Sequence, residues 1–263
     1  MDIQVKDKTV IVAASSSGLG RATAEEFAKE GAKVLISSRN EEQLKETCEE
    51  IKQASGNDHV AYAVCDLTSK EDIDALIEKA IDWTGAIDVL ITNAGGPPAG
   101  GFESFTDEDW TNAYELNVLS VVRLIRGVLP HMRKRGSGRI VNIASSSIKQ
   151  SIDNLVLSNT FRAGINGLSK SLSQELAADH ILINTVGPGR VYTGRVEALN
   201  KKQAELKGIT PEEVSAASEQ TIPMGRYGKP EEFAKVVMFL ASWANTYTTG
   251  QSLVVDGGLV KAL

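Results

Sequence analysis

The chain has 263 residues, of which 42% are hydrophobic and 24% charged, a composition typical of a globular protein and not of a disordered one. Its 28 Lys and Arg against 34 Asp and Glu give a net charge of −6, which disfavours a nucleic-acid partner. Cys48 and Cys65 are too few for a disulfide framework, and the three histidines are too scattered for a metal site. With no signal-peptide pattern and no run long enough for a membrane span, we expect a cytoplasmic protein.

Seven short apolar runs, rich in β-branched residues, predict strands that are buried on both faces. They cover residues 9–12, 33–36, 59–64, 87–91, 139–143, 181–184 and 252–255. Helix start signals lie between them, because Ser69 and Thr106 each precede an acid three residues later and Pro211 follows Thr210. Strands and helices that alternate over the whole length predict a single α/β domain, residues 1–263, with a doubly wound parallel sheet of the Rossmann type.

Two segments break this alternation, the Gly/Pro-rich loop 95–101 and the charged helical stretch 194–220. Both follow strands at the carboxyl side of the sheet, where open α/β folds bind their ligands. We therefore predict that these segments form the walls or the lid of a substrate cleft.

The turn after the first strand is rich in glycine and small residues, reading AASSSGLG over residues 13–20. A turn of this kind between a strand and a helix brings backbone N–H groups and a helix N-terminus to a pyrophosphate. A G-x-G alone is more often an ordinary tight turn, but its place at the head of an alternating chain favours a dinucleotide site.

Several motifs in the same order and spacing resemble the short-chain dehydrogenase/reductase family, and its 3-oxoacyl-[acyl-carrier-protein] reductases in particular. Residues 13–20 resemble the family's TGxxxGxG, with Ala13 and Ala14 in place of the first two residues. The other motifs are Thr92-Asn93-Ala94-Gly95 for NNAG, Asp66-Leu67 near the adenine, Gly187-Pro188-Gly189 with Thr193 for PGxxxT, and Asp256-Gly257-Gly258 for the carboxyl-terminal DGG.

The resemblance implies a set of cofactor-binding residues and a nicotinamide cofactor. Arg39 offers a forked cation to a 2′-phosphate, and Ser38 cannot replace the acid that binds the 2′-OH of NAD, so NADP(H) is favoured over NAD(H). A solvated Arg39 that opens a helix is the alternative. The implied residues are Ala14, Ser16, Ser17, Gly18, Leu19, Gly20, Ser38, Arg39, Asp66, Leu67, Asn93, Ala94, Gly95, Arg162, Pro188, Gly189, Val191 and Thr193.

The catalytic motif departs from the family pattern, which has a Ser, a Tyr thirteen residues later and a Lys four beyond that. Ser145 matches the Ser, but the count then reaches Ser158 and Arg162. Ser158 cannot inherit the role of the Tyr, because its hydroxyl is far less acidic and its side chain is much shorter. Arg162 keeps the positive charge and could hold the nicotinamide ribose or polarise a substrate oxygen, but it does not release a proton near neutrality.

The proton donor must then lie elsewhere, and three candidates stand open: Ser145 with an ordered water, Lys149 and Tyr192. A solvated Lys149 and a packing role for Tyr192 are the alternatives, and Ser145 could instead cap the strand end locally. Asn117 resembles the family's structural and catalytic Asn, and would order a water chain or brace its helix.

Four residues would make the cleft electropositive if all of them faced it, and the substrate would then be anionic. They are Lys149, Arg162, Tyr192 and Arg195. Two functions remain open. One is an NADP(H)-dependent oxidoreductase that interconverts the carbonyl and alcohol forms of a small molecule; the other, motivated by Ser158 and Arg162, is a catalytically impaired NADP(H)-binding sensor or regulatory protein. Apolar helix faces after Asp107 and over 158–178 predict a homodimer or homotetramer.

Overall fold

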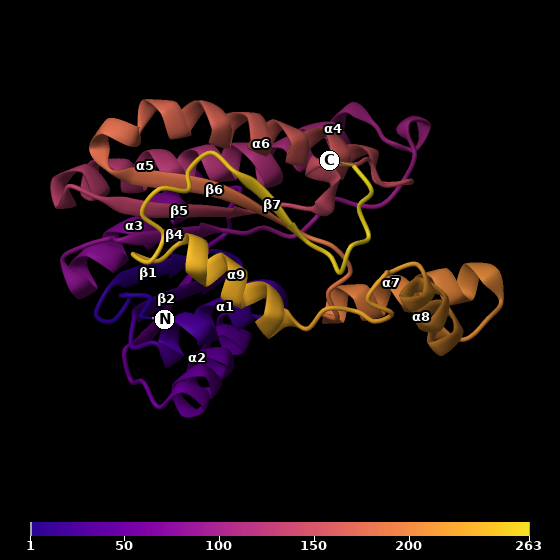
Figure 1. The fold of residues 1–263 in the computed structure, drawn as a ribbon, viewed down its shortest axis with the longest axis horizontal. Helices are drawn as coiled ribbons and strands as arrows, with labels where there is room; N and C mark the ends of the chain where they lie inside the picture. The colour runs from indigo at the N-terminus through magenta and orange to yellow at the C-terminus, as the bar shows by residue number, and fades with distance from the viewer. Residues whose placement is uncertain (1, 263) are drawn as a thin grey trace.

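The computed structural model describes residues 2–262, and in this range seven parallel strands form one sheet in the order β3-β2-β1-β4-β5-β6-β7 (Figure 1). The strands are β1 Thr9–Val12, β2 Lys33–Ser38, β3 Val60–Val64, β4 Val89–Thr92, β5 Gly138–Ile143, β6 Ile181–Pro188 and β7 Ser252–Val255. Each predicted strand is present and differs at most at its ends. The prediction of a doubly wound Rossmann-type sheet is confirmed.

Helices cover both faces of the sheet (Figure 1). One face carries α1 Gly18–Lys29, α2 Glu41–Ser55 and α9 Pro230–Leu240, and the other carries α3 Lys70–Thr84, α5 Ser120–Arg135 and α6 Val156–Glu175. Within the sheet, Val10 and Val12 join the core cluster on the first face and Ile11 joins the cluster on the second. Central strands buried on both faces explain why these runs are apolar without alternation.

Several helices begin where the sequence predicts. The Ser69 hydroxyl accepts a hydrogen bond from the backbone N–H of Asp72 at the start of α3. Thr106 and Asp109 form a complete capping box at the start of α4 Asp107–Tyr114. Thr210 does the same for α8 Pro211–Gln220, with proline at the first helical position. These local bonds satisfy N–H groups that no residue inside the helix can reach.

The remaining helical segments lie around the carboxyl edge of the sheet or at helix ends. They are α7 Gly194–Lys207, the short helices η1 Phe102–Ser104, η3 Ser146–Ile148 and η4 Ala177–Asp179, and the π-helical turn η2 Glu115–Leu119. In Figure 1, α7 and α8 project away from the sheet. The segment 194–220 is thus helical as predicted, and its role as a lid stays a prediction. No helix within residues 2–262 combines the length and apolar character that crossing a bilayer requires.

The strand order reverses between β1 and β4, so the chain leaves β1 for α1 on one face and leaves β4 for α5 on the other. At such a switch point the loops diverge and leave a crevice at the carboxyl ends of the strands. The fold therefore predicts a ligand site beside the ends of β1 and β4.

Candidate functional site

The first turn places the start of α1 directly at this crevice. Gly18 has a φ of 58°, a left-handed conformation that favours glycine. A Cβ at Gly20 would lie 2.6 Å from the Ala14 carbonyl oxygen and 2.8 Å from Nδ2 of Asn93, so only glycine fits there. The side chain of Ser17 does not cap α1, and the first turn holds no acid. The first N–H groups of α1 are therefore suited to an anionic diphosphate.

Ala14 stands where the family pattern has glycine, and it too is left-handed, with a φ of 46°. Its neighbours hold it in this conformation. The backbone N–H of Ala13 donates to the Ile91 carbonyl at 3.0 Å, that of Ser15 donates to the Ser37 carbonyl at 2.8 Å, and Nδ2 of Asn93 donates to the Ala14 carbonyl at 3.0 Å. The turn thus keeps a geometry that favours glycine although its residue is alanine.

The end of β2 forms the second part of the site. The Ser16 hydroxyl donates to Oγ of Ser38 at 3.1 Å, which ties the first turn to β2. An open depression of about 640 Å³ lies beside them, lined by Ser38, Arg39, Asn40 and Gln43. Arg39 is exposed and has room for a phosphate.

Asp66 follows β3 at the same edge. A backbone hydrogen bond from Thr68 lowers the pKa of Asp66, and the nearby Arg39 charge adds to this effect. The next residue, Leu67, is buried in the core. The charges of Arg39 and Asp66 therefore lie close together, where the adenosine end of a dinucleotide is expected.

The segment after β6 returns to the first turn. A Cβ on Gly18 would meet Cγ2 of Thr193 at 3.8 Å, so Thr193 lies over the start of α1. Gly189 packs directly on Asp256, and Val191 is buried. The fold thus brings the predicted cofactor residues together at one edge of the sheet, at or just after the carboxyl ends of β1, β2, β3, β4 and β6. These residues are 14–20, 38–39, 66–67, 93–95 and 188–193.

Ser145 follows β5 and is half-buried. Its Oγ accepts a hydrogen bond from the backbone N–H of Ser147 at 3.1 Å, so the local capping role is present. The hydroxyl proton of Ser145 is not used in this bond. Within the described residues, the buried Ser147 hydroxyl has no hydrogen-bond partner.

Arg162 is buried on α6, with 5% of its surface exposed. Its guanidinium donates to the Ile143 carbonyl at 3.2 Å and to the Ala94 carbonyl at 3.4 Å, and so lies between the ends of β5 and β4. Burial lowers the pKa of Arg162 to about 10, and the nearby Arg195 charge contributes. Arg162 therefore remains a cation at neutral pH.

Ser158 lies one helical turn before Arg162, and the two residues share one face of α6. The Ser158 side chain is buried, at 8% exposure. The spacing from Ser145 predicts the family's phenol at position 158, and the Ser158 hydroxyl is much shorter. Position 158 therefore holds no phenol, and position 162 holds no lysine.

Asn117 sits on the π-helical turn η2, which interrupts the run from α4 to α5. It is fully buried, and its Nδ2 donates to the Ala113 carbonyl at 3.0 Å. Its Oδ1 accepts no hydrogen bond from any described residue. A buried acceptor left unpaired costs about 1–3 kcal/mol, so a bound water is expected there. Such π turns occur often at functional sites.

Lys149 and Tyr192 lie at the surface. Lys149 is exposed beyond η3, and Tyr192 is 51% exposed. The Tyr192 ring packs edge-on against Tyr227, with the ring centroids 5.9 Å apart. Among the described contacts, no hydrogen bond joins either side chain to the Ser145 region, so their catalytic roles stay predictions.

Arg195, in the first turn of α7, joins the two segments that the sequence marks as cleft walls. Its guanidinium donates to the Gly96 carbonyl at 3.0 Å and to the Pro97 carbonyl at 3.3 Å. The sequence indicates Arg195 only as one of four residues that would make the cleft electropositive. No sequence signal could reveal this link, because it joins residues almost a hundred positions apart.

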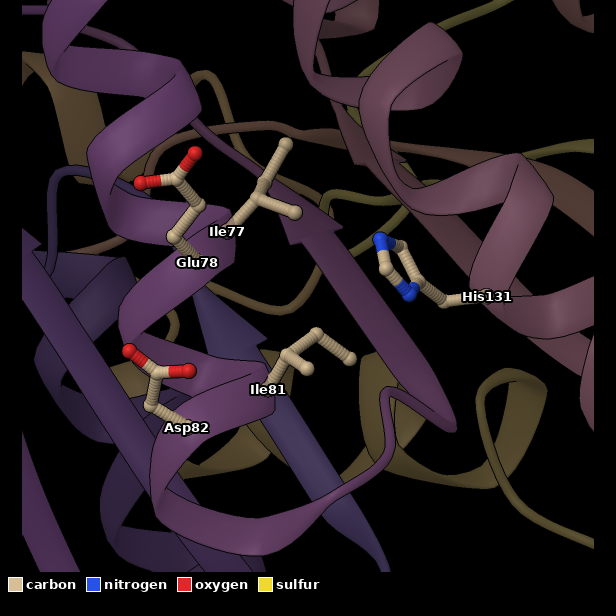
Figure 2. A pocket seen from close by; sticks show the side chains of 5 residues that line it. All are labelled: Ile77, Glu78, Ile81, Asp82 and His131. Carbon is tan, nitrogen blue, oxygen red and sulfur yellow. The ribbon is translucent and has the colours of Figure 1, made fainter.

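A second, smaller depression of about 270 Å³ lies between α3 and α5 (Figure 2). Ile77 and Ile81 face His131 across it, and the carboxylates of Glu78 and Asp82 point away from His131. The residues lie in the later halves of their helices, which run antiparallel to the strands. This depression is therefore at the opposite edge from the predicted cofactor residues.

Comparison with known proteins agrees with this geometry. Residues 13–260 match the family model described as Enoyl-(Acyl carrier protein) reductase. The chain is 33% identical to the uncharacterized oxidoreductase YvrD of Bacillus subtilis, with 100% of both chains aligned. It is 34% identical to the 3-oxoacyl-[acyl-carrier-protein] reductase FabG of Thermotoga maritima, over 98% of this chain and 100% of the relative.

Solved structures show the same likeness. An L-sorbose reductase from Gluconobacter frateurii, complexed with NADPH and L-sorbose, superimposes with a TM-score of 0.95 at 33% identity, covering 100% of both chains. An actinorhodin polyketide ketoreductase variant with NADPH superimposes with a TM-score of 0.91 at 33% identity, covering 98% of both chains. The chain therefore belongs to the short-chain dehydrogenase/reductase family of oxidoreductases.

Proposed function

We propose that this protein is an NADP(H)-dependent oxidoreductase that interconverts a carbonyl and an alcohol, similar in overall pattern to 3-oxoacyl-[acyl-carrier-protein] reductases. The observation that carries the proposal is the gathering of the dinucleotide residues and Ser145 at one edge of the sheet. The NADPH in the sorbose reductase and ketoreductase structures supports the same cofactor here.

The residues present fit a dinucleotide. The uncapped N–H groups of α1 would hold the diphosphate, and Arg39 would hold the 2′-phosphate that distinguishes NADP from NAD. Arg162 would bind either the nicotinamide ribose or the substrate, and the segment 188–193 would hold the nicotinamide carboxamide. NADP(H), when bound, supplies or accepts the hydride.

The chain's own contribution to proton transfer is non-standard. In this proposal Ser145 binds the substrate oxygen through its unused hydroxyl proton. A bound water delivers the proton that Ser158 cannot, and that water regains a proton from bulk solvent. The unpaired Oδ1 of Asn117 and the unpaired Ser147 hydroxyl support a bound water, because buried polar atoms of this kind normally bond to one. The exposure of Lys149 and Tyr192 favours water over either side chain as donor.

Three further features belong to the same proposal. The segment 194–220 acts as a substrate lid, supported by the contact of Arg195 with the loop at Gly96. The chain forms a homodimer or homotetramer. An aromatic cluster supports this, because the ring centroids of Trp110 and Phe161 lie 5.7 Å apart and the neighbouring Phe102 is 71% exposed, as is typical of an apolar surface that a second subunit covers. Two buried free thiols support a reducing, cytoplasmic location.

The second candidate is a catalytically impaired NADP(H) sensor or regulatory protein. The specific observation in its favour is the absence of an acidic phenol at position 158 together with a cation at position 162 that does not release a proton. This candidate needs the same cofactor residues, so cofactor binding alone does not separate the two.

A two-part experiment tests both functions. Calorimetric titration with NADPH and NADH measures binding, and NADPH oxidation is followed with ketoses, 3-oxoacyl thioesters and short oxo acids. We expect NADPH to bind at least about 10-fold more tightly than NADH, and Arg39→Ala to remove most of this preference, as expected for a charged hydrogen bond. Lys134→Ala, an exposed charge at the far edge, is the matched control.

The outcomes separate the candidates. Turnover of any carbonyl substrate with NADPH supports the oxidoreductase. Tight NADPH binding with no turnover on the whole panel overturns it in favour of the sensor. Absence of binding to either nucleotide overturns both.

A further inference from the structure

Two arginines from different helices hold the same loop. Arg162 of α6 donates to the carbonyl of Ala94, and Arg195 of α7 donates to the carbonyls of Gly96 and Pro97. One extended residue spans at most about 3.6 Å, so the carbonyls of Ala94 and Gly96 are within about 7 Å of each other. The two guanidinium groups are therefore neighbours on one short stretch of backbone.

Neither guanidinium has a counter-ion in the described part of the chain. Other arginines do, since Arg133 pairs with Asp179 at 2.8 Å and Arg226 with Glu232 at 2.7 Å, whereas no carboxylate lies within 4.0 Å of Arg162 or Arg195. The Arg195 charge lowers the pKa of Arg162, as repulsion between like charges does. Two neighbouring cations without an acid, one of them buried, are costly unless an anion joins them.

Both side chains keep donors available. A guanidinium has five N–H groups in a planar fork, and each of these arginines uses two of its nitrogens on carbonyl oxygens. The remaining donors match the two oxygens of a carboxylate. A lysine at position 162 would offer only a point charge.

The pair also lies at the edge of the sheet that carries Ser145. Arg162 contacts the carbonyl of Ile143, two residues before Ser145. Arg195 comes from the first turn of α7 and is exposed, so a ligand can reach it from solvent. A ligand bound between the arginines would thus lie at the carboxyl ends of β4 and β5, the edge of the sheet that also carries Ser145.

We propose that Arg162 and Arg195 together bind a carboxylate of the substrate, so that the enzyme acts on oxo acids and hydroxy acids in preference to neutral ketones or sugars. This inference rests on the proposed oxidoreductase function and specifies its substrate class. The proposal also explains an arginine in place of a lysine at position 162, because one guanidinium can bind both the Ala94 carbonyl and the substrate carboxylate.

The test compares short 2- and 3-oxo acids with their methyl esters, at saturating NADPH, in the parent and in Arg195→Met. We expect kcat/KM for the acids to exceed that for the esters by at least about 10-fold in the parent. Arg195→Met should lower kcat/KM for the acids by about 10- to 100-fold, the range for a lost charged hydrogen bond, and that for the esters by less than about 3-fold. Arg195→Lys should give an intermediate loss, because it keeps the charge without the fork.

Lys202→Met is the matched control, since it removes one exposed cation from the same helix. Lys202→Met should leave kcat/KM for the acids, kcat/KM for the esters and the Kd for NADPH unchanged. Equal kcat/KM for acids and esters in the parent overturns the carboxylate site and leaves the oxidoreductase standing. An equal loss for acids and esters in Arg195→Met, with weaker NADPH binding, also overturns it, because the guanidinium would then serve the cofactor diphosphate.

A binding experiment keeps the two proposals distinguishable if no turnover is found. Calorimetry with malonate and with malonamide on the NADP⁺-saturated protein probes the arginines without chemistry. If malonate binds, malonamide does not, and Arg195→Met abolishes malonate binding, the carboxylate site is supported even when the protein reduces no carbonyl substrate. Binding of neither probe, or of both equally, overturns it.

Discussion

Replacing Ala14 with glycine should stabilise the protein, because Ala14 is held with a φ of 46°. The left-handed conformation costs an alanine about 1–2 kcal/mol that glycine does not pay. Against this, glycine loses more freedom on folding, about 0.5–1 kcal/mol. The Ala14 methyl is partly packed against the core, so a small part of a methylene's burial, about 0.8 kcal/mol in full, is also lost.

The net effect of Ala14→Gly is then a gain of about 0.5 kcal/mol, or a rise in Tm of about 1–2 °C for a chain of this size. Ala13→Gly is the matched control, since it makes the same chemical change at a fully buried neighbour without positive φ. It should lose about 1.5 kcal/mol from the missing methyl and the added flexibility, a fall in Tm of about 3–6 °C.

Differential scanning calorimetry of the parent and both variants, without nucleotide, measures these shifts. The sharper quantity is the difference between the two variants, about 2 kcal/mol, because errors shared by both estimates cancel. An equal fall in Tm for Ala14→Gly and Ala13→Gly would refute the strain argument.

Three further outcomes are expected. Gly20→Ala should lower the free energy of unfolding by about 1–3 kcal/mol and weaken NADPH binding, because its Cβ would lie 2.8 Å from Nδ2 of Asn93; an unchanged urea midpoint and Kd would contradict the close packing. Burial raises the pKa of Cys65 to about 12, so iodoacetamide at pH 8 should label it only after denaturation, as read by intact mass spectrometry, and rapid labelling of the native protein would contradict this. Arg226 lowers the pKa of Glu232 to about 2, so the carboxylate stabilises the fold above its unfolded pKa of about 4.3 and this contribution fades as the pH falls towards 2. Glu232→Gln should therefore lower Tm more at pH 7 than at pH 3, and equal shifts at the two pH values would argue against the ion pair.

Local signals in the sequence determined the architecture. All seven apolar runs became strands, those at 9–12 and 252–255 with the predicted bounds, and Thr106 and Thr210 formed the capping boxes that their spacing predicts. Such features depend on residues within one turn or one strand, so the sequence displays them directly. The resemblance to the reductase family also predicted the cofactor residues, which the structure gathers at one edge of the sheet, and the lack of a phenol at Ser158.

Only the tertiary structure decided how the unusual residues are used. The left-handed Ala14 is held by Ser37 of β2 and by Ile91 and Asn93 at the end of β4, two parts of the chain that are distant in sequence. The contact of Arg162 with the Ala94 carbonyl spans 68 positions, and that of Arg195 with Gly96 spans 99. The partners of a long side chain depend on which loops lie near it in the folded protein. Hydrophobic periodicity and secondary-structure propensity in the sequence carry no information about that distance.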